Sequence, residues 1–470
     1  MRCFLVKILN YDEKIKNVDG KSRVCGLMMR FCLTLTLLLL ACAPATQRSP
    51  FGGPKYRQAI SIAETGAKDT IRNKGAIQIG WAKTEINSPK GVPLGGFGQR
   101  EGVASEGVLD PCYVRSFAIS IGTTTVLIIT ADLLALGYEM SEKVRREIHS
   151  VNPTAKVVFT ASHTHSGPGA YLPGLFELAL GKYDHRSEEA IIAAILDTST
   201  RALADLAPGR FSFVSDQIPD LVVNRIEIDG TVDEKSTLLF FEKKNSPRRA
   251  AIWTFPAHPV TRTYANKQIS ADYPGIIAAA FENKSLEILA FVSPAVASMN
   301  PKQEGGSLDW ITDPITQKLH RMLEIAQQKS VSQAHIAFNE VQIPFPPIRY
   351  RLTDSIMLLP LITEAVIPTH PLRIQSLRIN EFRVLTLPGE ISGEIGAGIH
   401  SQFSTPTSIW SFNGSYIGYV LPRRSYFLPG DRRAKLHHYE TKIMNFLGPW
   451  GADYLMNIGA RLMNQVSLEE

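Results

Sequence analysis

The sequence predicts an α/β protein, a layered sheet-and-helix domain with a metal site at the carboxyl ends of its strands. Runs of β-branched and aromatic residues alternate along the chain with segments of helical periodicity. Several of these runs end close to histidine, glutamate or tyrosine, which are possible metal ligands. The composition, 44% hydrophobic and 20% charged over 470 residues, is that of a globular protein with ample material for a large core.

The charge distribution indicates no nucleic-acid partner. The formal net charge is +6, but residues 1–41 hold seven Lys or Arg and only three Asp or Glu, so most of the excess lies in this short segment. The rest of the chain is nearly neutral, and we therefore expect no nucleic acid among the ligands.

The N-terminal residues predict a signal peptide over residues 1–41. Arg30 precedes the apolar run 31–40, which is too short to span a bilayer. A basic start, a short apolar stretch and a small residue before the break are typical of a secretory signal. Residues 1–27 are unusual ahead of such a signal, so Met28 or Met29 is a candidate for the true start.

The stretch Leu39-Leu-Ala-Cys42 resembles the bacterial lipobox, in which the cysteine becomes the lipidated first residue. We therefore expect Cys42 to anchor the protein to a membrane of the bacterial cell envelope, facing outside the cytoplasm on the periplasmic side or at the cell surface. An ordinary cleaved signal peptide is the alternative. The Pro-, Gly- and Ser-rich residues that follow predict a tether over residues 42–74 and a catalytic domain over 75–470. With Cys42 acylated, Cys112 has no partner for a disulfide.

The elements of the domain can be read in order. Residues rich in β-branched and aromatic side chains predict strands at 76–82, 113–121, 125–130, 156–160 and 236–243. Amphipathic periodicity predicts helices at 141–149, where Ser141 is the cap, and at 187–206, which Pro208 stops. The glycine-rich loop 91–98 lacks the Lys-Ser/Thr ending of a phosphate-binding loop.

Two histidines follow the strand at 156–160. Gly167, Pro168 and Gly169 end the extended segment shortly after them. Along a continued strand, His163 and His165 would face the same way. Two imidazoles on one side can share a metal ion, or one can bind the metal while the other moves protons. The alternative is a pair of surface loop histidines.

Later strands also end close to polar side chains. The run 250–256 is followed by His258, and the run 382–387 by Glu390. The run 407–412 is followed by an amide and then by Tyr416 and Tyr419. If these strands share a direction, their ends converge on one rim, where two or three histidines and a carboxylate form a zinc-type ligand set. Taken singly, each of these residues also has a structural explanation, such as a helix cap or a hydrogen-bonded core group.

From about residue 77 to residue 451 the chain resembles the neutral/alkaline, non-lysosomal ceramidases and their bacterial relatives. The stretch from His163 to Tyr171, His-Thr-His-Ser-Gly-Pro-Gly-Ala-Tyr, matches the most specific motif of that family almost letter for letter. Shorter matches complete the order: Leu94-Gly-Gly-Phe-Gly, Asp110-Pro-Cys-Tyr-Val-Arg, Asn224-Arg225, Ala257-His258-Pro259, Leu387-Pro-Gly-Glu390 and Tyr416-Ile-Gly-Tyr419.

The resemblance implies a zinc site and roles for the residues around it. Its zinc ligands are His163, His258, Glu390 and Tyr419, and His165 lies outside them as a proton-transfer residue. Zinc polarises a carbonyl group and lowers the pKa of bound water towards about 7. Arg225 would hold a polar head group or a developing oxyanion; a surface ion pair is its alternative. His165, Arg225 and Tyr419 are thus the expected catalytic residues.

The chain departs from the family at the catalytic serine. The ceramidases carry a Gly-Asp-x-Ser-Pro-Asn element, whereas the aligned residues are Ala297-Ser-Met-Asn300-Pro, so Asn300 stands in the place of the serine. Ser293 and Ser298 lie nearby, but neither matches that place. We therefore expect a metal-activated water, not a serine, to attack the substrate. The chain also stops where the ceramidases continue into a C-terminal β-sandwich domain.

We accordingly expect a zinc-dependent hydrolase of an amide (N-acyl) bond, acting on a ceramide-like or other lipid-like substrate. One alternative is a membrane-tethered binding lipoprotein that kept the fold and lost catalysis. Another is a metal-dependent esterase or amidase that acts on a cell-envelope substrate.

Overall fold

The computed structural model describes residues 42–44, 49–434, 439–442 and 444–466, apart from positions 283, 304, 349, 354, 360, 361, 365, 366, 368 and 404. The signal peptide expected over residues 1–41 lies outside the described residues, and so do Met28 and Met29. The described part begins with β1 (Cys42–Pro44), which pairs antiparallel with β15 (Ile356–Leu358).

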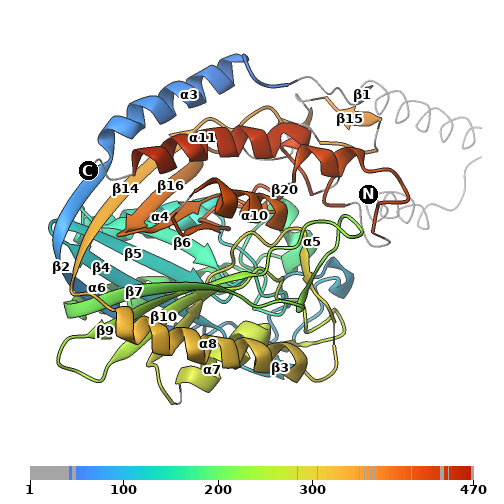
Figure 1. The fold of residues 1–470 in the computed structure, drawn as a ribbon. Coiled ribbons are helices and arrows are strands. Elements are labelled where there is room, and N and C mark those ends of the chain that lie inside the picture. The colour runs from blue at the N-terminus through green and yellow to red at the C-terminus, as the bar shows by residue number, and fades with distance from the viewer. Residues whose placement is uncertain are drawn as a thin grey trace, which may run out of the picture.

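The expected α/β architecture is confirmed as layers of sheet and helix (Figure 1). The main path of strands runs in the order β12-β10-β9-β7-β2-β14-β16-β17-β19, and β4, β5 and β6 extend in turn from β2. The bounds are β2 (Ile71–Glu85), β4 (Tyr113–Ile121), β5 (Thr124–Ala131), β6 (Lys156–Ala161), β7 (Ala207–Gln217), β9 (Lys235–Lys243), β10 (Arg249–Thr254), β12 (Ile288–Phe291), β14 (Gln333–Ile343), β16 (Leu372–Ile379), β17 (Phe382–Thr386) and β19 (Thr407–Trp410).

The long strand β2 joins two halves of this sheet. Its first part, from Ile71 to Ala76, pairs with β14, and its second part, from Ile77 to Glu85, pairs with β4. The halves pack on each other around a shared apolar core that includes Phe117, Phe241 and Trp410. Because both faces of β4 and β5 are covered, nearly all of their residues are buried, and their burial shows little alternation along the strand.

Helices cover the outer faces of the sheets (Figure 1). The apolar clusters place α4 and α6 against β4 to β6, α7 and α8 against β9, β10 and β12, and α3 and α11 against β14, β16 and β17. The bounds are α3 (Pro54–Gly66), α4 (Tyr138–Val151), α6 (His185–Ala204), α7 (Asp272–Glu282), α8 (Asp309–Lys329), α10 (Gly393–Gln402) and α11 (Gly451–Gln465). The two helices expected from the sequence correspond to α4 and α6.

Short strands, one short helix and 3₁₀ turns lie in the connections between these layers. They are β3 (Gly107–Val108), β8 (Val222–Asn224), β11 (Gln268–Ile269), β13 (Met299–Pro301), β18 (Glu390–Ile391), β20 (Tyr419–Val420) and α5 (Glu177–Leu180), with 3₁₀ turns η2 (Ala67–Asp69), η3 (Gly98–Arg100), η4 (Gly174–Phe176), η5 (Arg423–Phe427) and η6 (Gly448–Trp450).

The expected tether over residues 42–74 needs correction. Helix α3 lies within this range, and its Ala59 and Ala63 are buried in the cluster formed with β14, β16 and α11. Strand β2 also begins at Ile71, four residues before the expected domain start. The Pro/Gly-rich residues before position 54 favoured a tether in the sequence interpretation. The buried residues of α3 are small, so its hydrophobic periodicity is weak. The folded domain therefore begins near Pro54.

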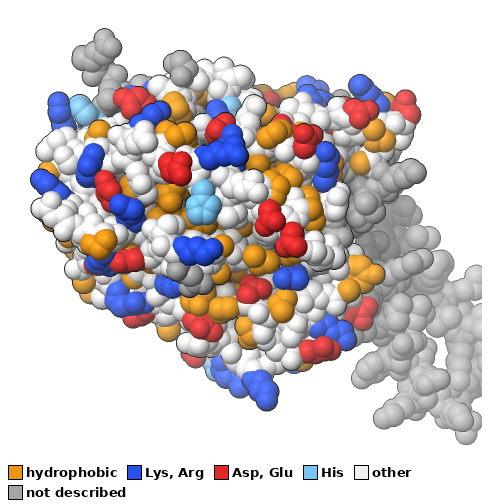
Figure 2. Space-filling model, turned by 60° about the horizontal axis from the view of Figure 1, so that its bottom comes forward, with side chains coloured by type: hydrophobic (Ala, Val, Ile, Leu, Met, Phe, Trp, Pro, Cys, Tyr) orange, Lys and Arg blue, Asp and Glu red, His pale blue; other side chains and the backbone are white. Residues whose placement is uncertain are grey.

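The described surface is mixed in charge. Figure 2 shows the face that lies below in Figure 1, with Lys or Arg and Asp or Glu side chains interspersed among single hydrophobic residues. This agrees with the near-neutral balance of the chain after residue 41. Within the described ranges, no helix combines the length and the apolar character needed to cross a bilayer.

Candidate active site

The ends of strands from both halves of the sheet meet at one place. The backbone N–H of Ser293, after β12, donates to the carbonyl of Ala161 at the end of β6, with a distance of 3.1 Å. The carbonyl of Ser293 in turn accepts from the N–H of Ser411, after β19, at 3.0 Å. The convergence expected from the sequence is therefore built by backbone hydrogen bonds between strand ends.

His163 is held with its Nε2 atom facing this place. Its backbone adopts a left-handed φ of 63° and its N–H donates to the carbonyl of Leu133 at 3.0 Å. The Nδ1 atom lies 2.6 Å from the carbonyl oxygen of Leu134, and the ring stacks on Phe412 with centroids 4.1 Å apart. Because the carbonyl can only accept, Nδ1 carries the proton and Nε2 keeps a lone pair.

His258 is oriented in the same manner. Its Nδ1 atom lies 3.0 Å from the carbonyl oxygen of Met299, so its Nε2 also keeps a lone pair. That Nε2 lies 3.2 Å from Oε2 of Glu390, and Nε2 of His163 lies 3.6 Å from the same oxygen. The other oxygen of Glu390 accepts a hydrogen bond from the hydroxyl of Tyr416 at 2.6 Å.

These three side chains form a set of acceptors that fits a cation. All of them are buried, and Nε2 of each imidazole faces the same carboxylate oxygen, with Nη2 of Arg225 3.5 Å from Nε2 of His258. Burial lowers the pKa of His258 to about 4, so its ring is neutral at neutral pH. Burial opposes the charged form of Glu390, but the charge that His163 and His258 carry when protonated outweighs it and holds the pKa of this carboxyl well below its usual range. Neutral imidazoles and an anionic carboxylate are a zinc ligand set.

His165 lies closer to this set than the sequence interpretation assumed. Its Nε2 is 3.3 Å from Nε2 of His163. One ring nitrogen from each of His163, His165 and His258 falls within a group that spans 4.8 Å, close enough to hold a metal ion together. The Nδ1 of His165 is buried and has no hydrogen-bond partner among the described residues. The Nδ1 atom of His165 is thus available for a ligand or a proton, while its Nε2 faces His163.

Tyr419 is placed beside Glu390 by the backbone but is linked to the site through Arg225. Strands β18 and β20 pair Glu390 with Tyr419. An Arg225 Nη2 atom donates to the Tyr419 hydroxyl at 3.2 Å and lies 3.5 Å from Nε2 of His258. Among the described contacts, Tyr416, and not Tyr419, bonds directly to the carboxylate of Glu390. Burial and the nearby Glu390 raise the pKa of Tyr419 well above its usual value.

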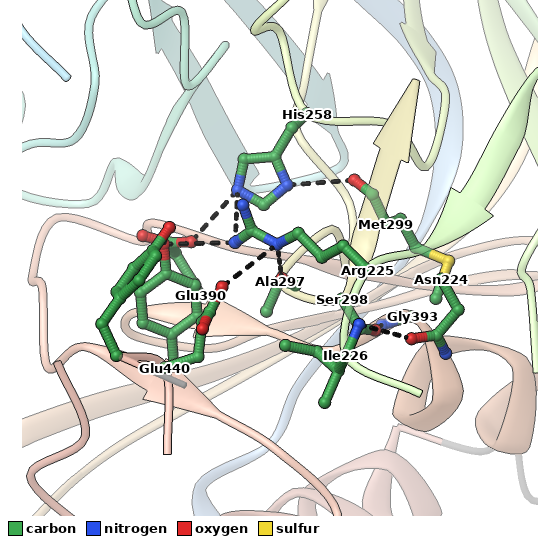
Figure 3. Close-up of polar contacts among 12 residues, drawn as sticks. Asn224, Arg225, Ile226, His258, Ala297, Ser298, Met299, Glu390, Gly393 and Glu440 are labelled. Carbon is green, nitrogen blue, oxygen red and sulfur yellow. Dashed lines mark hydrogen bonds and ion pairs between the residues drawn. The ribbon is translucent and has the colours of Figure 1, made fainter. Parts of the chain in front are cut away.

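Arg225 is a buried member of the site, not part of a surface ion pair (Figure 3). Its side chain is 10% exposed. The Nε atom donates to the carbonyl of Ala297 at 2.9 Å and lies 3.6 Å from Glu440, a fully buried carboxylate. Burial opposes the charge of Arg225, but Tyr439, Tyr419 and Glu440 outweigh it and raise its pKa well above the usual range. Arg225 therefore keeps a fixed positive charge beside the histidines.

The segment that replaces the serine element supports the site through its backbone (Figure 3). The carbonyl of Ala297 accepts from the Arg225 side chain, and that of Ser298 accepts from the Arg225 backbone N–H at 2.8 Å. The carbonyl of Met299 faces Nδ1 of His258. Asn300 pairs with Val223 between β13 and β8.

Among the described contacts, neither serine near this segment bonds to a histidine of the site. The hydroxyl of Ser298 accepts from the N–H of Gly393 at 3.0 Å and donates to the carboxylate of Glu394, at the start of α10. The hydroxyl of Ser293 is fully buried and has no hydrogen-bond partner among the described residues.

Sequence reasoning missed three site residues. Tyr416 and Phe412 lie within the stretch that contains Tyr419, but only the fold shows that they contact Glu390 and His163. The burial of Glu440 beside Arg225 has no local signature in the sequence.

Comparisons with known proteins agree with this fold. Residues 77–307 match the family described as neutral/alkaline non-lysosomal ceramidase, N-terminal. The neutral ceramidase of Pseudomonas aeruginosa is 25% identical over 248 residues, which are 47% of this chain and 37% of that protein. The neutral ceramidase of Mycobacterium tuberculosis is 25% identical over 174 residues, 33% of this chain and 27% of that protein. The matches thus span well under half the length of these relatives.

Solved structures show the same architecture over a larger part of the chain. The crystal structure of neutral ceramidase from Pseudomonas aeruginosa matches 84% of this chain and 75% of its own, with a TM-score of 0.69 and 19% identity. A ceramidase complexed with C2 matches 84% of this chain and 77% of its own, with a TM-score of 0.66 and 18% identity. The similarity to the neutral/alkaline non-lysosomal ceramidase family thus lies in segment 77–307, slightly less than half of this chain.

Proposed function

We propose that this protein is a zinc-dependent hydrolase that cleaves the amide bond of an N-acyl lipid, with ceramide-like molecules as the substrate class. The observation that supports it most is the convergence of the His163 and His258 Nε2 atoms on one oxygen of Glu390. Both curated relatives are named neutral ceramidases, and we infer from that name that the substrate is a lipid with an amide bond. We propose Tyr419 as a fourth ligand, because it is paired with Glu390 in the short parallel strands β18 and β20.

Zinc at this site would polarise the amide carbonyl and lower the pKa of a water molecule. His165 would accept a proton from the attacking water and pass it to the nitrogen of the leaving amine. The carbonyl carbon gains the hydroxyl of water and the C–N bond breaks, so the products are a carboxylic acid and an amine. Arg225 and the hydroxyl of Tyr419, 3.2 Å apart, would together stabilise the negative charge that develops on the carbonyl oxygen.

The position of the serines supports attack by water. The Ser298 hydroxyl is engaged with Gly393 and Glu394, and Asn300 has no nucleophilic side-chain atom. Ser293 lacks a base within hydrogen-bonding distance among the described residues. A serine nucleophile needs such a base to be activated.

Exposed apolar side chains near the site support a lipid-like substrate. Leu178, on α5, is 74% exposed, and Tyr264 is 60% exposed. Leu178 precedes Ala179, whose carbonyl accepts from the N–H of Gly96 in the glycine-rich loop 91–98. The carbonyl of Tyr264 accepts from Nε of Arg100, in the turn after that loop. Apolar residues gathered beside a buried polar site suit a molecule with a polar head and long hydrocarbon chains.

A panel of N-acyl lipids, incubated with the purified protein, tests this proposal. We expect release of the fatty acid from at least one lipid, loss of that activity in a chelator and its return on addition of zinc. His163→Ala should abolish the activity, whereas His185→Ala, which changes a histidine with a 70% exposed side chain, should not. Tight binding of an N-acyl lipid without hydrolysis would instead favour a binding lipoprotein, and hydrolysis confined to esters or cell-envelope amides would assign another substrate class.

A further inference from the structure

The imidazole of His165 is not fixed by hydrogen bonds in the way that its two neighbours are. In His163 and His258 the Nδ1 atom faces a backbone carbonyl oxygen, at 2.6 and 3.0 Å. The Nδ1 atom of His165 is buried and has no hydrogen-bond partner among the described residues. A hydrogen bond at Nδ1 is the usual means of fixing both the tautomer and the orientation of a site histidine. Another set of contacts must therefore orient this ring.

The glycine-rich loop supplies packing contacts to that ring. Gly96 adopts φ +113°, and a Cβ atom there would lie 2.7 Å from Cα, Cβ and Cγ of His165. Only a residue without a side chain can approach so closely. The ring of Phe97 packs edge-on against the imidazole, with centroids 5.0 Å apart. His163 lies edge-on to it as well, at 4.8 Å, so aromatic rings enclose the imidazole.

Arg100 ties the end of this loop to the backbone of His165. Its Nη1 atom donates to the carbonyl of His165 at 2.5 Å and to that of Gly95 at 3.3 Å. Its Nη2 atom donates to the hydroxyl of Ser166 and to the carbonyl of Thr263, at 3.3 and 3.1 Å. Burial lowers the pKa of Arg100 only to about 10, so the guanidinium remains charged and all its contacts persist at neutral pH.

We propose that Gly96, Phe97 and Arg100 are positioning residues that fix the imidazole of His165 for proton transfer. This inference rests on the proposed hydrolase function. Packing on Gly96 and Phe97 holds the ring, and the bond from Arg100 holds its backbone, while Nδ1 has no partner among the described residues.

A double-mutant cycle between Phe97 and His165 tests the proposal. Phe97→Ala should lower kcat by roughly tenfold to a hundredfold, because a small misplacement of a reacting group is enough for such a loss. KM should change by less than about twofold and zinc content should be unchanged. In the His165→Ala background, the same Phe97→Ala change should have almost no further effect, since positions that act as a unit are not additive. Phe97→Tyr, which keeps the ring, should restore most of the activity.

Equal losses of kcat in both backgrounds would overturn the proposal, because Phe97 would then act on the substrate or the fold. Gly96→Ala offers a second variant, with Gly98→Ala as its control, since a Cβ at Gly98 meets only the carbonyl oxygen of Leu178 at 3.4 Å. We expect a large loss of kcat for the first and none for the second.

Crystal structures of the zinc-loaded variants give a readout that does not depend on turnover. In Phe97→Ala, the ring of His165 should rotate or occupy two positions while those of His163 and His258 stay in place. An unmoved ring would contradict the positioning role even if the protein hydrolyses N-acyl lipids. If no N-acyl lipid is hydrolysed but the ring moves as expected, the proposed function fails and the positioning role stands.

Discussion

The Nε2 atoms of His163 and His258 lie 3.6 and 3.2 Å from one oxygen of Glu390, and Nη2 of Arg225 lies 3.5 Å from Nε2 of His258. A buried set of acceptors is unfavourable unless a positive charge occupies the space they share. Their other polar atoms are already satisfied, by the carbonyls of Leu134 and Met299 and by the hydroxyl of Tyr416. At the scale of single residues, the site is therefore organised to hold a cation.

We predict that His165→Ala will lower the rate of amide hydrolysis by about 10² to 10⁴-fold, the usual contribution of a general acid–base group. Zinc should remain bound, because His163, His258 and Glu390 are intact. The comparison is Ser293→Ala, which should change the rate only slightly if water attacks. Steady-state rates and metal analysis of both variants make the check. A thousandfold loss in Ser293→Ala with zinc and fold preserved would show that a serine is the nucleophile.

Glu440 predicts a pH dependence of stability. Burial raises the pKa of this carboxyl to about 7, against an ordinary value of 4.5. The folded state therefore holds its proton over a range in which the unfolded state has lost it. The contribution of Glu440 to the free energy of unfolding is complete below pH 4.5 and is lost as the pH rises to about 7.

The free energy of unfolding of the wild type, measured relative to that of Glu440→Gln, should therefore fall from pH 5 to pH 7 and stay constant above that pH. Urea unfolding of the zinc-free proteins at a series of pH values measures it. A difference that does not change with pH would mean that Glu440 titrates normally in the folded protein.

At the scale of elements, the sequence indicated strand ends correctly but not how they meet. Runs rich in β-branched and aromatic residues marked β4, β5, β6 and β9 to within a few residues, because most side chains of these strands are buried. The motif around His163 then placed the site at the end of β6. By contrast, the contacts of Tyr416 and Glu440 depend on the packing of distant loops, which local patterns do not encode. Helix α3 was missed because a proline- and glycine-rich stretch precedes it.

Helix α6 packs closely on β2, and a single substitution can test this contact. A Cβ atom at Gly80 would lie 2.2 Å from the carbonyl oxygen of Ala202, so the helix backbone rests directly on the strand. We expect Gly80→Ala to lower the free energy of unfolding by about 1–3 kcal/mol, the usual effect of overpacking.

Gly398→Ala is the matched control for that change. Gly398 lies within α10, and a Cβ there meets nothing within 4 Å. Alanine should raise the stability by roughly 0.5–1 kcal/mol, because glycine is unfavourable inside a helix. Denaturant unfolding compares the two variants, and equal destabilisation by both would argue against the close approach of α6.

At the scale of the whole molecule, the described chain is one layered domain that begins near Pro54, preceded by a short N-terminal segment. Cys42 lies in β1, paired with β15 and partly exposed. The sequence before it predicts lipidation, and such an anchor would place the proposed hydrolase at a membrane surface. One acyl chain gives only marginal membrane binding, so stable anchoring implies at least two chains.

We predict that Cys42→Ser converts the protein from a membrane-bound to a soluble form. Fractionation of cells that express each form, followed by immunoblotting, measures the change. A variant that stays wholly with the membranes would show that the hydrophobic leader remains attached as the anchor and that the lipobox interpretation is wrong.

Zinc stoichiometry tests the central claim most directly. The purified wild type should bind one tightly held zinc ion per chain, and His163→Ala and His258→Ala should each lose it, whereas His185→Ala should keep it. Each protein should be checked for native unfolding behaviour, so that loss of metal is not loss of fold. Full zinc occupancy in folded His163→Ala and His258→Ala would contradict a metal site at the converging strand ends.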